Sequence, residues 1–119
     1  MGNEWTALQR FWSNFGLSAY DENTVPDDAP LPHITYESAV ADFDSKIPLT
    51  ASLWYRSTSW AEISEKAHEI GCFIGGGVGV PYEHGRLWIV KESPFAQRMG
   101  EPTDDKIRRI VLQISAEYQ

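Results

Sequence analysis

The fold is decided by residues 85–118, which read GRLWIVKESPFAQRMGEPTDDKIRRIVLQISAEY. The last part of this stretch alternates strictly, because every second residue is apolar and successive side chains of a strand point to opposite faces. The apolar face consists of Ile110, Leu112, Ile114 and Ala116. This pattern predicts a long strand from about 106 to 118 with one buried face, and the run 86–91 predicts a neighbouring strand.

Residues 92–105, between these two strands, contain two prolines and predict an exposed interaction loop. Phe95 and Met99 are large apolar side chains in a segment that is expected to be solvated. Such side chains either fold back onto the core or contact a partner.

The composition fits a single globular domain that spans residues 1–119. The chain has 119 residues, of which 42% are hydrophobic and 23% are charged. No apolar run approaches the roughly 20 residues that cross a bilayer. The N-terminus has neither the basic flank nor the apolar region of a signal peptide. The sequence therefore predicts no membrane partner.

The charge is negative overall and unevenly distributed. The net charge of −7 argues against sequence-specific nucleic acid as a partner. Residues 1–84 carry a net charge of −8, whereas residues 85–119 carry +1. This difference is either ordinary surface variation or a polarity that lets copies associate head to tail, with opposite potentials meeting.

Two amphipathic helices are predicted. The first follows Asn3 and ends at Gly16, and its apolar residues repeat at helical spacing. They are Trp5, Leu8, Phe11, Trp12 and Phe15. The second helix begins at the capping box Ser59-Trp60-Ala61-Glu62. It ends either at Gly71 or at Ile74, and the glycine run 75–77 breaks it in either case.

The remaining segments complete an α+β fold. Residues 17–32 predict an acidic, proline-rich loop, while 33–40 and 49–56 alternate as two strands of an antiparallel hairpin. Residues 78–82 predict a further strand. The result is a mostly antiparallel sheet of about five strands packed by two helices, in the order α-β-β-α-β-β-β.

No catalytic, metal or cofactor constellation is evident in the sequence. The histidines His33, His68 and His84 have no second histidine or cysteine at ligand spacing, and no nucleophile elbow is present. The single Cys72 lies in an apolar stretch and predicts a small buried hydrophobe. The sequence thus predicts neither an enzyme nor a cofactor.

Several short motifs follow one another in a specific order. They are Leu31-Pro32-His33-Ile34-Thr35-Tyr36, Trp54, Ser59-Trp60, Leu87-Trp88-Ile89, Pro94-Phe95-Ala96-Gln97-Arg98-Met99, Pro102-Thr103-Asp104-Asp105 and Ile107-Arg108-Arg109. From about residue 31 onward, the chain resembles the tail-terminator (tail-completion, minor tail) proteins of long-tailed bacteriophages and prophages. That family also has a helix where this chain has its N-terminal one.

The resemblance implies a structural subunit of the virion tail, at the head–tail junction, that assembles in the host cytoplasm. Such proteins form a homohexameric ring that caps the tail tube, stops its polymerisation and offers a surface to head–tail connector proteins. No catalysis and no cofactor are implied. The expected subunit or tail-tube interface comprises Pro94, Phe95, Gln97, Arg98, Met99 and Arg108.

Two other functions remain open from the sequence. A head-completion or neck connector protein is the alternative among virion components. A small ligand-binding domain or enzyme is the alternative from another class, and a deep pocket with convergent polar groups would favour it. A flat surface lined by tryptophan would favour assembly.

Overall fold

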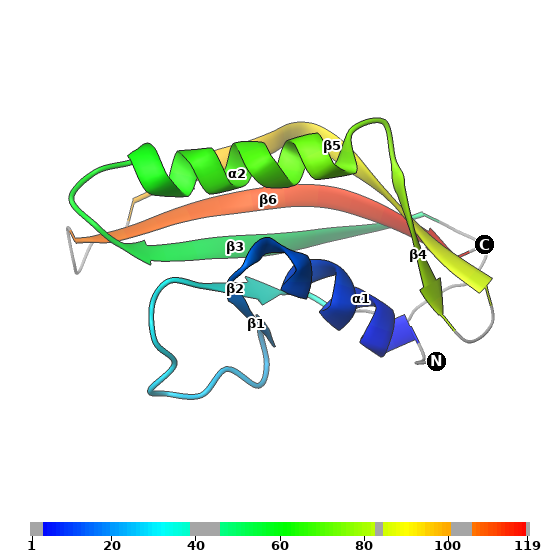
Figure 1. Cartoon of the computed structure of the whole chain (residues 1–119), viewed down its shortest axis with the longest axis horizontal. Helices are drawn as coiled ribbons and strands as arrows, with labels where there is room; N and C mark the ends of the chain where they lie inside the picture. The colour runs from blue at the N-terminus through cyan, green and yellow to red at the C-terminus, as the bar shows by residue number, and fades with distance from the viewer. Residues whose placement is uncertain (1–3, 39–45, 83–84, 101–105, 119) are drawn as a thin grey trace.

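The computed structural model describes residues 4–38, 46–82, 85–100 and 106–118. A six-stranded sheet forms one layer, and both helices lie on the same side of it (Figure 1). The strands are β1 (Ser18–Asp21), β2 (His33–Tyr36), β3 (Ile47–Arg56), β4 (Val78–Tyr82), β5 (Gly85–Met99) and β6 (Ile107–Tyr118). The helices are α1 (Glu4–Trp12), which continues as the 3-10 turn η1 (Ser13–Phe15), and α2 (Ala61–Ile74).

The strand order across the sheet is β1-β2-β3-β6-β5-β4. The two longest pairings join β6 to β3 and to β5, and both are antiparallel. β2 and β3 form the predicted antiparallel pair, with His33 opposite Trp54. The sheet is thus mostly antiparallel, as predicted, and its C-terminal strand lies at the centre.

The core occupies the helix side of the sheet. The alternation predicted for the last strand is confirmed, because its four apolar residues are at most 3% exposed. Leu53 lies opposite Ile110, and Ala51 lies opposite Leu112, so β3 and β6 present their apolar residues to the same face. Four of the five residues in the predicted stripe of the first helix are also buried, and the Trp5 side chain lies outside the described part of the chain. The buried apolar residues of the helical segments are Ala7, Leu8, Phe11, Trp12, Phe15, Ile63, Ala67, Ile70 and Ile74.

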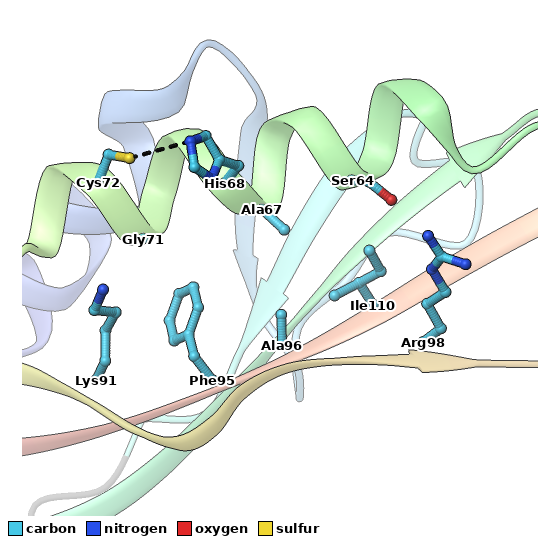
Figure 2. Close-up of a pocket in the computed structure, with 10 residues that line it drawn as sticks. All are labelled: Ser64, Ala67, His68, Gly71, Cys72, Lys91, Phe95, Ala96, Arg98 and Ile110. Atoms are coloured by element: carbon cyan, nitrogen blue, oxygen red, sulfur yellow. Dashed lines mark hydrogen bonds between the residues drawn. The ribbon is translucent and has the colours of Figure 1, made fainter.

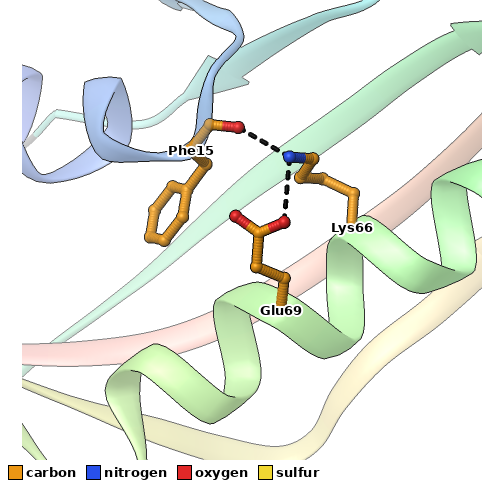
Figure 3. Close-up of polar contacts among 3 residues, drawn as sticks. All are labelled: Phe15, Lys66 and Glu69. Atoms are coloured by element: carbon orange, nitrogen blue, oxygen red, sulfur yellow. Dashed lines mark hydrogen bonds and ion pairs between the residues drawn. The ribbon is translucent and has the colours of Figure 1, made fainter.

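One polar contact joins the two helical segments (Figure 3). The Lys66 ammonium of α2 donates to the Phe15 carbonyl at 2.7 Å and lies 3.0 Å from a Glu69 carboxylate oxygen. The chain leaves η1 through Gly16, whose φ of 76° is the left-handed conformation that suits glycine. Lys66 therefore satisfies a carbonyl at the end of the first helical segment.

The sheet has one strand more than predicted. β1 lies within residues 17–32, which the sequence predicts to be loop, and it pairs with β2 in parallel. β1 has only four residues, which is too few for an alternation of apolar and polar side chains to identify a strand. Asp21 ends it in a turn, in which its carboxylate accepts from the Asn23 N–H at 2.9 Å.

The second helix begins slightly later than predicted. Its N-cap is Trp60, without a side-chain cap, whereas the Ser59 hydroxyl accepts from the Ala61 N–H at 3.0 Å. The predicted capping box is therefore wrong. Cys72 is exposed rather than buried, because it lies on the outer side of α2 between Gly71 and Phe73, and Phe73 is 48% exposed.

The predicted loop 92–105 is largely a continuation of β5, which runs to Met99. The register against β6 shifts between Lys91 and Ala96, so a bulge takes up the irregular residues around Pro94. The side-chain amide of Gln113 on β6 donates a hydrogen bond to the Pro94 carbonyl at 2.9 Å and so stabilises the bulge. Residues 101–105 lie outside the described part of the chain.

Candidate assembly surface

The structure divides the six predicted interface residues between the two faces of the sheet. Five lie on β5 and Arg108 lies on β6, which pairs with β5 through this region. Ala96 and Arg98 pair with the buried residues Leu112 and Ile110. Alternation therefore directs Arg98 to the helix side, and directs Gln97 and Met99 to the uncovered side.

Phe95 folds back onto α2. A Cβ atom added at Gly71 would meet the Phe95 ring at 3.2 Å, so the ring rests directly on the helix backbone. Phe95 is half-buried and packs against the core, whereas Met99 is 41% exposed. Of the two apolar side chains, one thus supports the fold and the other remains on the surface.

Trp60 connects the start of α2 to the neighbouring strands β5 and β6. The guanidinium groups of Arg98 and Arg108 each lie 5.2 Å from the centroid of the Trp60 ring. Arg108 also donates to the Thr58 carbonyl at 3.0 Å. Stacking of guanidinium on indole is attractive, so these contacts hold the helix start to the sheet. The role predicted for Arg98 and Arg108 at a subunit interface stays a prediction.

A groove lies between α2 and the second half of β5, and we call it the α2–β5 groove (Figure 2). Its volume is about 410 Å³. It is lined by Ser64, Ala67, His68, Gly71, Cys72, Lys91, Phe95, Ala96, Arg98 and Ile110. The Lys91 ammonium lies 5.8 Å from the Phe95 ring centroid. The groove therefore has an apolar floor and cationic side chains on its β5 side.

His68 and Cys72 lie one helical turn apart on the rim of this groove. The Cys72 Sγ atom is 3.4 Å from His68 Nε2, and the dashed line in Figure 2 marks this contact. The sequence interpretation did not anticipate this contact, which arises because residues four apart on a helix share a face. Within the described ranges, no cluster of three or more His, Cys, Asp or Glu residues could hold a metal ion.

A second cleft, of about 400 Å³, lies over β2 and β3 on the uncovered side of the sheet. The polar side chains that line this cleft form hydrogen bonds and stacking contacts with one another. The Arg109 guanidinium lies 4.7 Å from the Trp54 ring centroid and donates from Nε to the Ser52 hydroxyl at 3.1 Å. Trp54 donates from Nε1 to the Thr35 hydroxyl at 2.9 Å. These contacts stiffen the outer face of the sheet.

Sequence reasoning missed Trp60 and Lys91 as parts of the surface. The sequence places Trp60 at the start of the second predicted helix and Lys91 at the end of a predicted strand. An extension of β5 beyond Lys91 would have placed Lys91 near Phe95 and Trp60 near Arg98, but the prolines of 92–105 argue against a strand there. None of the helices in the described residues is long and apolar enough to span a membrane.

No family model matches the sequence, and no curated protein matches it. Among solved structures, the chain is similar to one chain of a structure described as the virion of a native gene transfer agent (GTA) particle. The TM-score is 0.59 and the sequence identity is 20%, over 92% of this chain and 81% of that chain. This similarity shows that the two chains share a fold.

Proposed function

We propose that this protein is a structural component of a phage-like virion and acts as a tail terminator. Copies form a ring on the end of the tail tube, stop its polymerisation and present a surface to the head–tail connector. The observation that carries the proposal is the shared fold with a chain of a virion particle over 92% of the sequence. The motifs of residues 31–109 support the more specific role.

The surface chemistry supports assembly over catalysis. Exposed Met99 and Phe73 leave apolar area on the outside of a small domain, and the half-buried Trp60 lies beside two arginines. Aromatic residues, methionine and arginine are enriched in protein interfaces. We assign the protein no catalytic role and no cofactor.

The first test is the mass of the purified protein in solution, measured by light scattering across a concentration series. Negative-stain images of the large species complete it. We expect a closed hexameric ring, because head-to-tail contacts that close generate rings. A chain that stays monomeric at every concentration is then mixed with purified tail tubes, and we expect it to bind at one tube end.

The place of binding separates the two virion roles. A terminator binds the end of a tail tube and blocks further addition of tube protein, which a polymerisation assay measures. Binding to the head connector, with no effect on tube growth, would assign the neck role instead. Absence of binding to either component would overturn the proposal.

A further inference from the structure

We propose that the α2–β5 groove of one copy receives the acidic loop of the next copy. The acidic loop consists of residues 22–32, between β1 and β2. This inference rests on the proposed ring and names the contact that would close it. Three observations support it: the opposite charges of the two surfaces, their positions toward opposite ends of the sheet, and an unpaired strand edge beside the groove.

The groove fits an acidic segment that also carries small apolar residues. Its floor is formed by Phe95, Ala67 and Ile110, and the exposed side chains of Lys91 and Arg98 lie along the β5 side. Within the described ranges, neither cation forms an ion pair with a carboxylate, since their contacts are with aromatic rings. Both charges are therefore available to an incoming anion.

The neighbouring carboxylate of Glu92 does not neutralise this side of β5. It accepts a hydrogen bond from the Ser115 hydroxyl at 2.8 Å. Ser115 pairs with Val90 and Pro48 and belongs to the side of β6 opposite Ile114, which faces the helices. Glu92 is thus held toward the uncovered side, away from the groove.

The acidic loop supplies the matching charge. Asp27 and Asp28 are exposed, whereas the Asp21 carboxylate that precedes the loop is held by the Ser38 hydroxyl and the Asn23 N–H. The hydrogen bond from Ser38 is the main cause that lowers the pKa of Asp21. Asp27 and Asp28 are therefore the aspartates whose carboxylates can contact a partner. Nearby prolines limit the conformational freedom that docking would remove.

The two surfaces lie toward opposite ends of the sheet. The loop leaves β1, which is one edge strand, while the groove lies on β5, separated from β1 by β2, β3 and β6 (Figure 1). The loop therefore reaches a groove only in another molecule. A contact between two different surfaces of identical chains is head to tail, and it closes into a ring when the rotation permits.

The backbone beside the groove provides a second attraction. β4 pairs with β5 only over residues 85–89, and in the described chain beyond them residues 90–91 and 96–99 pair with β6 alone. The outer edge of 90–99 thus presents unpaired backbone groups next to the groove. Such an edge accepts an extended segment by strand addition, which combines main-chain hydrogen bonds with side-chain selectivity.

Charge reversal tests the contact in the full-length chain. One variant carries Lys91→Glu with Arg98→Glu, and the other carries Asp27→Lys with Asp28→Lys. We expect each alone to associate at least about tenfold more weakly in sedimentation, because each reverses the charge of one surface. An equimolar mixture should regain assembly with the two variants alternating. Lys46→Glu with Lys106→Glu makes the same change in net charge elsewhere and should leave assembly intact.

Cross-linking gives a readout that does not require a stable ring. A carbodiimide joins amines to carboxylates in direct contact, and mixing isotope-labelled with unlabelled protein identifies links between copies. We expect links from Lys91 to Asp27 or Asp28 between copies, and their loss in the aspartate variant. Thermal melts of all variants check that the fold is retained.

Two results would overturn the inference. One is that both charge-reversed variants still assemble like the wild type. The other is that cross-linked wild-type protein contains no links between Lys91 of one copy and Asp27 or Asp28 of another. Neither result bears on binding to the tail tube, so the proposed function would stand with a different subunit contact. Conversely, the protein could form the Lys91 links and yet bind neither the tube nor the connector. The subunit contact would then stand, and the proposed virion role would be wrong.

Discussion

The two halves of β5 lie in different surroundings. Residues 85–89 pair with β4 on one side, and Leu87 and Ile89 also pair with β6 on the other and are fully buried. Residues 92–99 lie beyond β4, only 96–99 of them pair with β6, and all except the half-buried Phe95 are exposed. One continuous strand therefore completes the core with its first half and presents a surface with its second, so changes in the two halves should differ in kind.

The largest effect is expected in the first half. Ile89→Ala should lower the free energy of unfolding by about 2–5 kcal/mol, because it removes a fully buried side chain and leaves a cavity. Urea denaturation followed by tryptophan fluorescence measures the change. Gln97→Ala in the exposed second half is the matched control and should change stability by less than about 0.5 kcal/mol. Equal effects of the two variants would contradict the division of β5.

The next effect concerns the chain that leads into β4. Gly77 has a φ of 139°, and an added Cβ atom would meet the Trp88 ring of β5 at 2.2 Å. Gly77→Ala should therefore cost about 1–3 kcal/mol through overpacking and backbone strain together. At Gly76 an added Cβ meets nothing within 4 Å, so Gly76→Ala is the control and should cost less. If both alanines cost the same, Trp88 does not pack on Gly77.

The first half of β5 and its neighbouring elements could be predicted from the sequence, because the pattern of apolar residues within each element is enough to identify it. Ile110, Leu112 and Ile114 alternate without interruption, and a period of two has no other common explanation. The aromatic stripe of α1 repeats at 3.6 residues and ends at a glycine. In both elements the pattern along the chain is the same as the pattern of burial in space.

The second half of β5 could not be read in this way. Pro94 lacks a backbone N–H and usually marks a turn, and only a bulge opposite β6 lets it remain within a strand. β1 is four residues long and depends on β2 for pairing. The α2–β5 groove joins residues 64–72 to residues 91–98, so it exists only once the long pairing of β5 with β6 has formed.

Phe95 should show an intermediate effect, since it is half-buried against α2. We expect Phe95→Ala to lower the free energy of unfolding by about 1–2 kcal/mol, less than a full deletion of a buried aromatic ring. Met99→Ala, at a side chain that is 41% exposed, should change it by less than about 0.5 kcal/mol. Chemical denaturation of the two single variants gives both numbers. A neutral Phe95→Ala would mean that the ring serves a partner rather than the fold.

The smallest effect is a coupling between Gly71 and Phe95. Alanine is favoured over glycine in a helix by roughly 0.5–1 kcal/mol, but in the wild type the new methyl group would lie 3.2 Å from the Phe95 ring and crowd it. We therefore expect Gly71→Ala to be close to neutral in the wild type, and to stabilise by about 0.5–1 kcal/mol in the Phe95→Ala background. The four free energies of unfolding form a double-mutant cycle, whose difference isolates the contact. A Gly71→Ala effect that is the same in both backgrounds would show that Phe95 does not rest on α2. The second half of β5 would then be held by its pairing with β6 alone.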